Sequence, residues 1–139
     1  MALEIGFIQV VRSKEIKEFM TRVLNEVSKK HSHILNTILM EDNISFPAIW
    51  TSDVTNSTTA PFSDKLMMFH VSMLLNSTIF FYGAALSTCM RKDLASNYMA
   101  FISKDLVVSE DAAEIMIDQK WLEQPPQTIN HEALSNTSG

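Results

Sequence analysis

SKEIKEFMTRVLNEVSKKHSHILNTILMED, at residues 13–42, shows the clearest helical period in the chain. Ser13 is a suitable N-cap for a helix, and Glu15 follows in the first turn, where the helix dipole favours an acid. At 100° per residue, the apolar positions and one histidine share one side of this helix: Ile16, Phe19, Met20, Val23, Leu24, Val27, His31, Ile34, Leu35 and Ile38. The pattern predicts one amphipathic helix that ends near Asp42–Asn43.

Three further helices are expected, one before this stretch and two after it. The 139-residue chain has only three glycines and four prolines, which favours a few long elements over many tight turns. A short helix of about 15 Å should precede residue 13. A long segment, apolar on most sides, follows the capping residues Ser63–Asp64. The expected bounds are Ala2–Val11, Leu66–Met90 and Asp93–Lys120, with Asp93 as the cap of the last helix.

The connection between the second and third helices sets the expected topology. Residues 43–62 contain two prolines and a cluster of Ser, Thr and Asn, and they show no period. A loop of about twenty residues is unusual inside a compact domain, and a crossover along the bundle accounts for it. The second and third helices would then be parallel, with the fourth antiparallel to both. His31 and Asp105 would lie at similar heights, about 27 and about 22 Å along the bundle, with His70 apart at about 10 Å.

Composition favours one cytoplasmic domain. Residues 1–126 should form a single helical-bundle domain, whereas residues 127–139 are polar and aperiodic and should form a disordered tail. The formal charge of −5 argues against nucleic acid as a partner. Cys89 is the only cysteine, so no intrachain disulfide is possible and a reducing compartment is expected. The N-terminal residues lack the basic stretch of a secretory signal.

The third expected helix has a second interpretation. Leu66–Met90 contains no Asp, Glu, Lys or Arg, and its length suits a transmembrane helix. His70, Asn76 and several hydroxyl side chains would make insertion costly. The amphipathic helices on either side also need an apolar partner. We therefore favour the central helix of a soluble core, with no membrane span.

No catalytic motif is present. The glycines are isolated, which excludes a phosphate-binding loop, and no Gly-x-Ser-x-Gly sequence occurs. A di-iron carboxylate centre in a bundle uses Glu-x-x-His on two helices, and no Glu of this chain has His three positions later. We therefore expect no enzyme activity, no catalytic residue and no cofactor.

Four polar side chains remain as candidate metal ligands: Glu26, His31, His33 and Asp105. A lone histidine on an apolar helix face is more often a hydrogen-bonded core residue than a ligand. His31 and His33 differ by 200° around a straight helix, so they cannot bind one ion together. His33 and Glu26 share a flank and equally suit a solvated pair.

Three groups of residues carry a family resemblance: KKHSHI at 29–34 followed by SFP at 45–47, STCMRKDL at 87–94, and WLEQPP at 121–126. In this order and spacing they resemble a domain-of-unknown-function family of endospore-forming bacteria, related to spore coat protein F. The resemblance covers residues 7–127. His33 matches a recurrent histidine of the family. Ser45 and Lys120 stand where members usually have glycine, and the first helix begins about half a helix late.

The resemblance implies a ferritin-like, up-down four-helix bundle. In this chain we expect that bundle to have a long crossover loop between the second and third helices and a truncated first helix. The resemblance also implies a non-catalytic structural or interaction role of spore-coat type, with cytoplasmic or spore-associated localisation and spore coat proteins as partners. The alternative is a metal- or small-ligand-binding ferritin-like bundle that lacks the usual di-iron motifs.

The short first helix predicts a homodimer. It would leave more than half of the groove along the other helices uncovered, and an exposed apolar strip of that size usually marks an interface. The alternative is that residues 43–62 fold over the gap with Phe46, Ile49, Trp50 and Val54. The strip should include several of Met67, Phe69, Met73, Leu74, Phe80 and Phe81.

Overall fold

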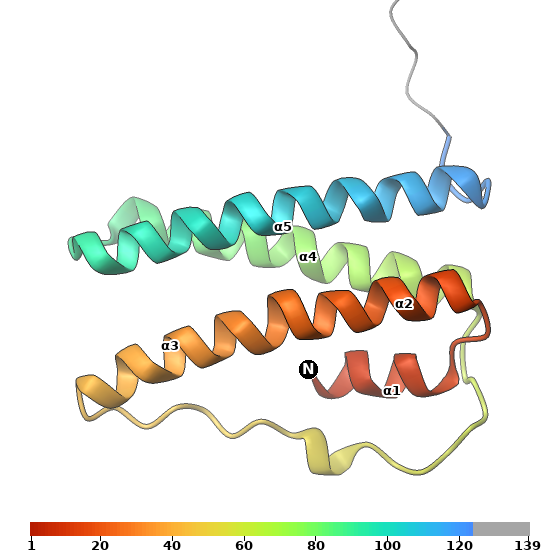
Figure 1. The fold of residues 1–139 in the computed structure, drawn as a ribbon, viewed down its shortest axis with the longest axis horizontal. Coiled ribbons are helices and arrows are strands. Elements are labelled where there is room, and N and C mark those ends of the chain that lie inside the picture. Colours follow the sequence, from red (N-terminus) through yellow and green to blue (C-terminus); the bar gives the residue numbers. More distant parts are fainter. Residues whose placement is uncertain (124–139) are drawn as a thin grey trace, which may run out of the picture.

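The computed structural model describes residues 1–123, which form four helical rods (Figure 1). The π-helical turn η1 joins α2 and α3 into one rod. No strand occurs within these residues, which confirms the expected all-helical class. The expected tail at 127–139 lies outside the described residues. The elements are α1 (Ala2–Val10), α2 (Lys14–Val23), η1 (Leu24–Ser28), α3 (Lys29–Glu41), a 3-10 turn η2 (Thr51–Asp53), α4 (Asp64–Thr88) and α5 (Lys92–Asp118).

The α2–α3 rod and α4 run in the same direction, and α5 runs against both (Figure 1). At one end, the Ser13 backbone N–H donates to the Asp64 carboxylate at 2.8 Å. Further along, the Tyr82 hydroxyl lies 3.4 Å from His31 Nδ1. Both pairs are 51 positions apart, which requires parallel helices in a constant register. The segment between α3 and α4 returns along the length of the molecule.

The helix ends follow local chemistry in most cases. Ser13 and Ser63 act as N-caps, because each hydroxyl accepts a hydrogen bond from the backbone N–H three residues later. The prediction that Asp93 caps the last helix is wrong: Arg91 is the N-cap residue, and Asp93 lies in the first turn, where it accepts hydrogen bonds from the Arg91 guanidinium. α4 also ends at Thr88, two residues before the expected bound.

The turn η1 changes the phase of the long rod. Its wider i→i+5 hydrogen bonding breaks the constant 100° step that the sequence pattern assumes. After it, His31 is the only buried residue of α3. Ile34, Leu35 and Ile38, which the pattern placed on the buried face, are half-buried.

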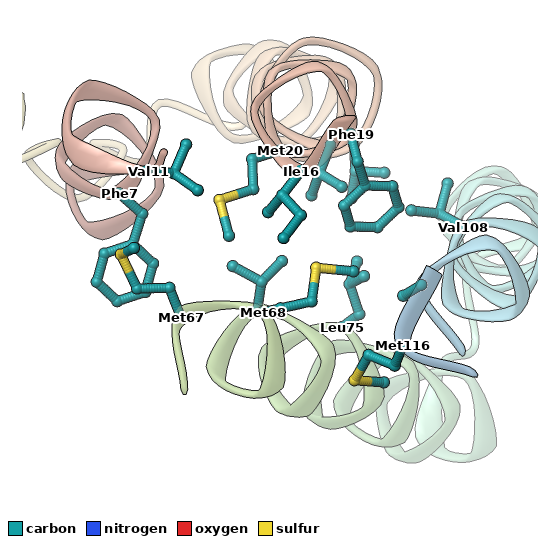
Figure 2. Close-up of a cluster of buried hydrophobic side chains, with 14 residues drawn as sticks. Phe7, Val11, Ile16, Phe19, Met20, Met67, Met68, Leu75, Val108 and Met116 are labelled. Atoms are coloured by element: carbon teal, nitrogen blue, oxygen red, sulfur yellow. The ribbon is translucent and has the colours of Figure 1, made fainter. Parts of the chain in front are cut away.

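The apolar core lies where four helices meet (Figure 2). Side chains of α1, α2, α4 and α5 point toward one centre, and several of them are methionines, whose flexible chains fill irregular spaces. The labelled core residues are Phe7, Val11, Ile16, Phe19, Met20, Met67, Met68, Leu75, Val108 and Met116.

The other half of the molecule has only three helices. The N-terminus of α1 lies part-way along the α2–α3 rod, beside the first turns of α3, so α1 leaves most of that half uncovered (Figure 1). We define the three-helix half as α3, residues 76–88 of α4 and residues 92–107 of α5. Its fully packed side chains are His31, Phe101 and Asp105. The half without α1 therefore has a core that is small and partly polar.

Lys120 ends α5 in a left-handed conformation, with φ at 57°. The Lys120 N–H donates to the Ile117 carbonyl and the Trp121 N–H to the Met116 carbonyl, which is the Schellman arrangement that favours glycine. Lys120→Gly should therefore raise the free energy of unfolding by about 1 kcal/mol. Urea unfolding with Lys120→Ala as the control tests this, since alanine keeps the backbone strain. Equal stabilities for the two variants would contradict it. At the end of α3, the left-handed residue is Asn43 and not Ser45.

Candidate functional site

Three polar side chains from three helices meet inside the three-helix half. His31 comes from α3, Tyr82 from α4 and Asp105 from α5. His31 Nδ1 lies 3.8 Å from Asp105 Oδ1 and 3.4 Å from the Tyr82 hydroxyl. His31 and Asp105 are buried, and Tyr82 is half-buried. We call these three residues the buried polar cluster.

Aromatic rings enclose the cluster. The His31 imidazole stacks on the Phe101 ring with centroids 4.0 Å apart, and it meets the Tyr82 ring edge to face. Tyr98 packs against both Tyr82 and Phe101. These rings fix the imidazole plane and separate the cluster from water, which strengthens every charge interaction inside it.

Asp105 is the anomaly of this site. Its side chain is 0% exposed, and neither carboxylate oxygen has a hydrogen-bond partner. The nearest basic atom, His31 Nδ1 at 3.8 Å, is beyond hydrogen-bond reach. Burial raises the pKa of Asp105 to about 6. At neutral pH the protein therefore holds an unpaired buried carboxylate, which is costly unless something compensates it.

Burial also shifts the other two groups toward their neutral forms. It lowers the pKa of His31 to about 4, with a smaller contribution from the Lys104 ammonium. Burial, Asp105 and Tyr98 together raise the pKa of Tyr82 to about 12. At neutral pH the imidazole is therefore uncharged and has a lone pair available for a hydrogen bond or a cation.

The structure brings two of the four candidate ligands together and places the other two elsewhere. The predicted proximity of His31 and Asp105 is confirmed, and His70 lies elsewhere, against Phe7. Glu26 instead accepts a hydrogen bond from Lys104, which lowers its pKa. His33 is exposed and lines a pocket of about 240 Å³ with Phe46 and Ile49. Within residues 1–123, no three His, Cys, Asp or Glu side chains group closely enough to hold a metal ion.

The sequence reasoning missed Tyr82. Tyr82 lies in a helix that is apolar by composition, so its hydroxyl does not stand out as a candidate ligand. The available signal was that a tyrosine in a packed bundle needs a hydrogen-bond partner. That partner is His31, which lies next to Tyr82 because α3 and α4 are parallel. From the sequence, this parallel arrangement follows only from the predicted crossover.

The two pKa shifts in the cluster oppose each other. Asp105 holds its proton more tightly in the folded state, so its contribution to stability falls as pH rises from about 4 to about 6. His31 holds its proton less tightly when folded, so its contribution rises between about 4 and 6.5. In metal-free protein, Asp105→Asn should therefore gain stability relative to the wild type across this window, by up to about 3 kcal/mol.

Urea unfolding at several pH values between 4 and 6.5 measures this effect. His31→Gln is the matched variant, because it should lose stability relative to the wild type over the same window. Taking differences from the wild type removes the background of the exposed carboxylates. Parallel pH profiles for the two variants would contradict the assignment.

An exposed apolar surface runs along α4. Leu66, Met73 and Phe80 recur every seven residues, as do Leu74 and Phe81, so these five residues share one side of the helix. Phe80 is 71% and Phe81 67% exposed. We call these five residues the α4 apolar face. The expectation that the exposed strip includes several of six named residues is confirmed for Met73, Leu74, Phe80 and Phe81. The other two do not belong to it, because Met67 is fully buried and Phe69 packs against the core.

The segment between α3 and α4 lies against α1 and does not cover this face. The Gln9 side-chain amide donates to the backbone carbonyls of Thr55 and Ser57 and so holds the segment on α1. A cavity of about 440 Å³ lies between them, lined mainly by apolar side chains. Ile49 and Trp50, which were expected to fold over the gap in the alternative interpretation, are 45% and 69% exposed.

By length and composition, α4 could cross a membrane. Its mean hydropathy reaches 1.3 over an 18-residue window, of which 28% is buried within the bundle. The core helix of a soluble protein meets the same criteria, so this single helix is weak evidence for a span. Its buried side, with Met68, Val71 and Leu75, packs in the apolar core.

These features define an all-helical bundle with an apolar face on α4 and a polar cluster in its smaller half. The chain belongs to the DUF3231 family, described as a protein of unknown function, whose model matches residues 1–134. A solved protein of Bacillus halodurans C-125, described as a "putative spore coat protein", has a similar fold, with a TM-score of 0.72 and 16% sequence identity. The similarity covers 91% of this chain and 82% of that one. No protein with a curated description matches.

Proposed function

We propose that this chain is a non-catalytic structural or interaction protein of spore-coat type, which acts through the surfaces of a ferritin-like bundle as a two-fold homodimer. The name of the Bacillus halodurans protein supports the spore association. The parallel pair of long rods, joined by a segment that returns along the molecule, supports the ferritin-like arrangement, since ferritin-like bundles have one long crossover. We propose cytoplasmic synthesis followed by association with spore coat proteins.

The α4 apolar face carries this proposal. Large aromatic and Met side chains exposed together on one helix are uncommon on a soluble monomer and usually mark an interface. Met73, Asn76, Ser77, Phe80 and Phe81 also line a hollow of about 320 Å³ on this surface. A hollow beside a protruding aromatic side chain suits a symmetric contact, in which the Phe80 ring of each copy enters the hollow of the other.

Charge favours a second copy of this chain as the occupant. The chain carries a net charge of −5, so most surfaces of two copies repel each other. Residues 66–90 contain no Asp, Glu, Lys or Arg, so the α4 apolar face can approach its own copy without burying a charge. Because cyclic dimers are the commonest oligomers, this self-contact closes with two-fold symmetry.

Fractionation of sporulating cells of the native host tests the spore association. We expect the protein in the fraction that is extracted with the spore coat, and a Phe80→Glu variant should be depleted there if the dimer is the form that assembles. Recovery of the wild-type protein only from the soluble cytoplasm would contradict the spore-coat role. Recovery only from the cell membrane would contradict the soluble bundle.

A further inference from the structure

The buried polar cluster contains a carboxylate, that of Asp105, with no positive charge to balance it. Asp105 is fully buried with two unpaired oxygens, and the neutral His31 imidazole does not reach it. Native proteins rarely keep such a carboxylate without a partner, because an uncompensated buried charge costs several kcal/mol. The nearby Lys104 ammonium is already hydrogen-bonded to Glu26. The missing partner is therefore not a side chain of the described residues 1–123.

The spacing of the cluster atoms matches the edges of a metal coordination shell. A tetrahedral ion with bonds of about 2.1 Å to oxygen and nitrogen separates its ligands by roughly 3.4 Å. His31 Nδ1 lies 3.4 Å from the Tyr82 oxygen and 3.8 Å from Asp105 Oδ1. These two distances are too long for strong direct hydrogen bonds and are close to the ligand–ligand separation of such an ion. The donors are a carboxylate, an imidazole and a phenol, each from a different helix.

We propose that Asp105, His31 and Tyr82 form a binding site for one divalent transition-metal cation of the Zn²⁺ type. Imidazole nitrogen and carboxylate oxygen are preferred ligands of Zn²⁺. The ion binds Asp105 and His31 Nδ1, and the phenol oxygen of Tyr82 supplies the third ligand as its proton leaves to solvent. The two anions then balance the charge of the dication in a site with little access to water. By joining α3, α4 and α5, the ion would hold together the half of the bundle that lacks α1.

The local backbone supports the same placement. The π-helical turn η1 ends at Ser28, just before the turn of α3 that carries His31. Such turns add a residue to a helix, re-aim the side chains that follow, and occur often at functional sites. Stacking on Phe101 then fixes the imidazole so that Nδ1 faces both other ligands.

Titration calorimetry of tag-free protein with ZnCl₂ tests the proposal, together with thermal unfolding with and without the ion. We expect one ion per chain and a higher Tm in its presence. Asp105→Asn keeps the shape of the side chain and removes the buried charge, so it should fold normally yet lose most of the affinity. The loss should exceed the ~10–100-fold cost of removing an outer-shell partner of a metal site. Tyr82→Phe should weaken binding and abolish the accompanying proton release.

His33→Gln is the matched control, because His33 is exposed and lies on the same helix two residues from His31. This variant should bind Zn²⁺ as the wild type does. The proposal is overturned if the wild type binds no ion stoichiometrically, if Asp105→Asn binds equally well, or if His33→Gln removes the binding. None of these results depends on the homodimer, since binding is counted per chain and the cluster lies away from the α4 apolar face.

Discussion

Phe80→Glu should raise the Kd of the proposed homodimer by about 100-fold or more. Aromatic side chains near the centre of an interface commonly contribute 2–4 kcal/mol, and about 1.4 kcal/mol corresponds to a factor of ten. In this variant a carboxylate would also enter an uncharged contact without a partner, which adds a desolvation cost. Because Phe80 is 71% exposed in the single chain, the substitution should leave the fold of the monomer intact. Analytical ultracentrifugation over a dilution series measures the change.

Met90→Glu provides the control for this prediction. Met90 is fully exposed at the connection between α4 and α5, so the variant adds the same charge outside the α4 apolar face. It should dimerise with nearly the Kd of the wild type. Equal Kd values for the wild type and Phe80→Glu would place the interface elsewhere. Circular dichroism of both variants should show unchanged helix content.

Ile16→Ala should lower the free energy of unfolding by about 4 kcal/mol, the second large effect. Ile16 is 0% exposed in the first turn of α2 and packs where α1, α2, α4 and α5 meet (Figure 2). Truncating a buried isoleucine removes its transfer free energy and leaves a cavity, at a typical total cost of 2–5 kcal/mol. The small size of the domain makes this a large fraction of its stability.

Ile44→Ala is the matched control for Ile16→Ala. Ile44 is 53% exposed after the end of α3, so its truncation should cost less than about 0.5 kcal/mol. Urea unfolding of both variants at constant protein concentration gives the comparison. Similar losses in the two variants would contradict the position of the core.

Features with local causes were predictable from the sequence. The Ser13 and Ser63 caps follow from a hydroxyl next to an amphipathic pattern, and both are confirmed. The glycine position at Lys120, noted through the family resemblance, corresponds to a left-handed backbone. The proximity of His31 and Asp105 was also predictable, because the rise per residue gives the position of each side chain along its helix.

Features set by neighbours could not be predicted in the same way. The π-helical turn η1 has no compositional signature, so the pattern did not predict it. Ile34, Leu35 and Ile38 are only half-buried, because α1 does not cover this part of the bundle. Met67 lies on a helix that is apolar on most sides, and only the position of α1 decides that Met67 is buried while Met73 is exposed. The Asp93 carboxylate forms an ion pair with Arg91 and does not cap the helix. Tyr82 joins the candidate site through a contact that exists only in the folded bundle.

Light scattering coupled to size exclusion tests the central claim most directly, namely that the bundle works through its α4 apolar face. At tens of micromolar, the proposed homodimer predicts a single species with twice the chain mass of 15.7 kDa. It also predicts little binding of an apolar dye, because the second copy covers the face. A monodisperse 15.7 kDa monomer would contradict the homodimer. Strong dye binding by that monomer would mean that a different partner occupies the face, and no dye binding would mean that the face is not an interface at all.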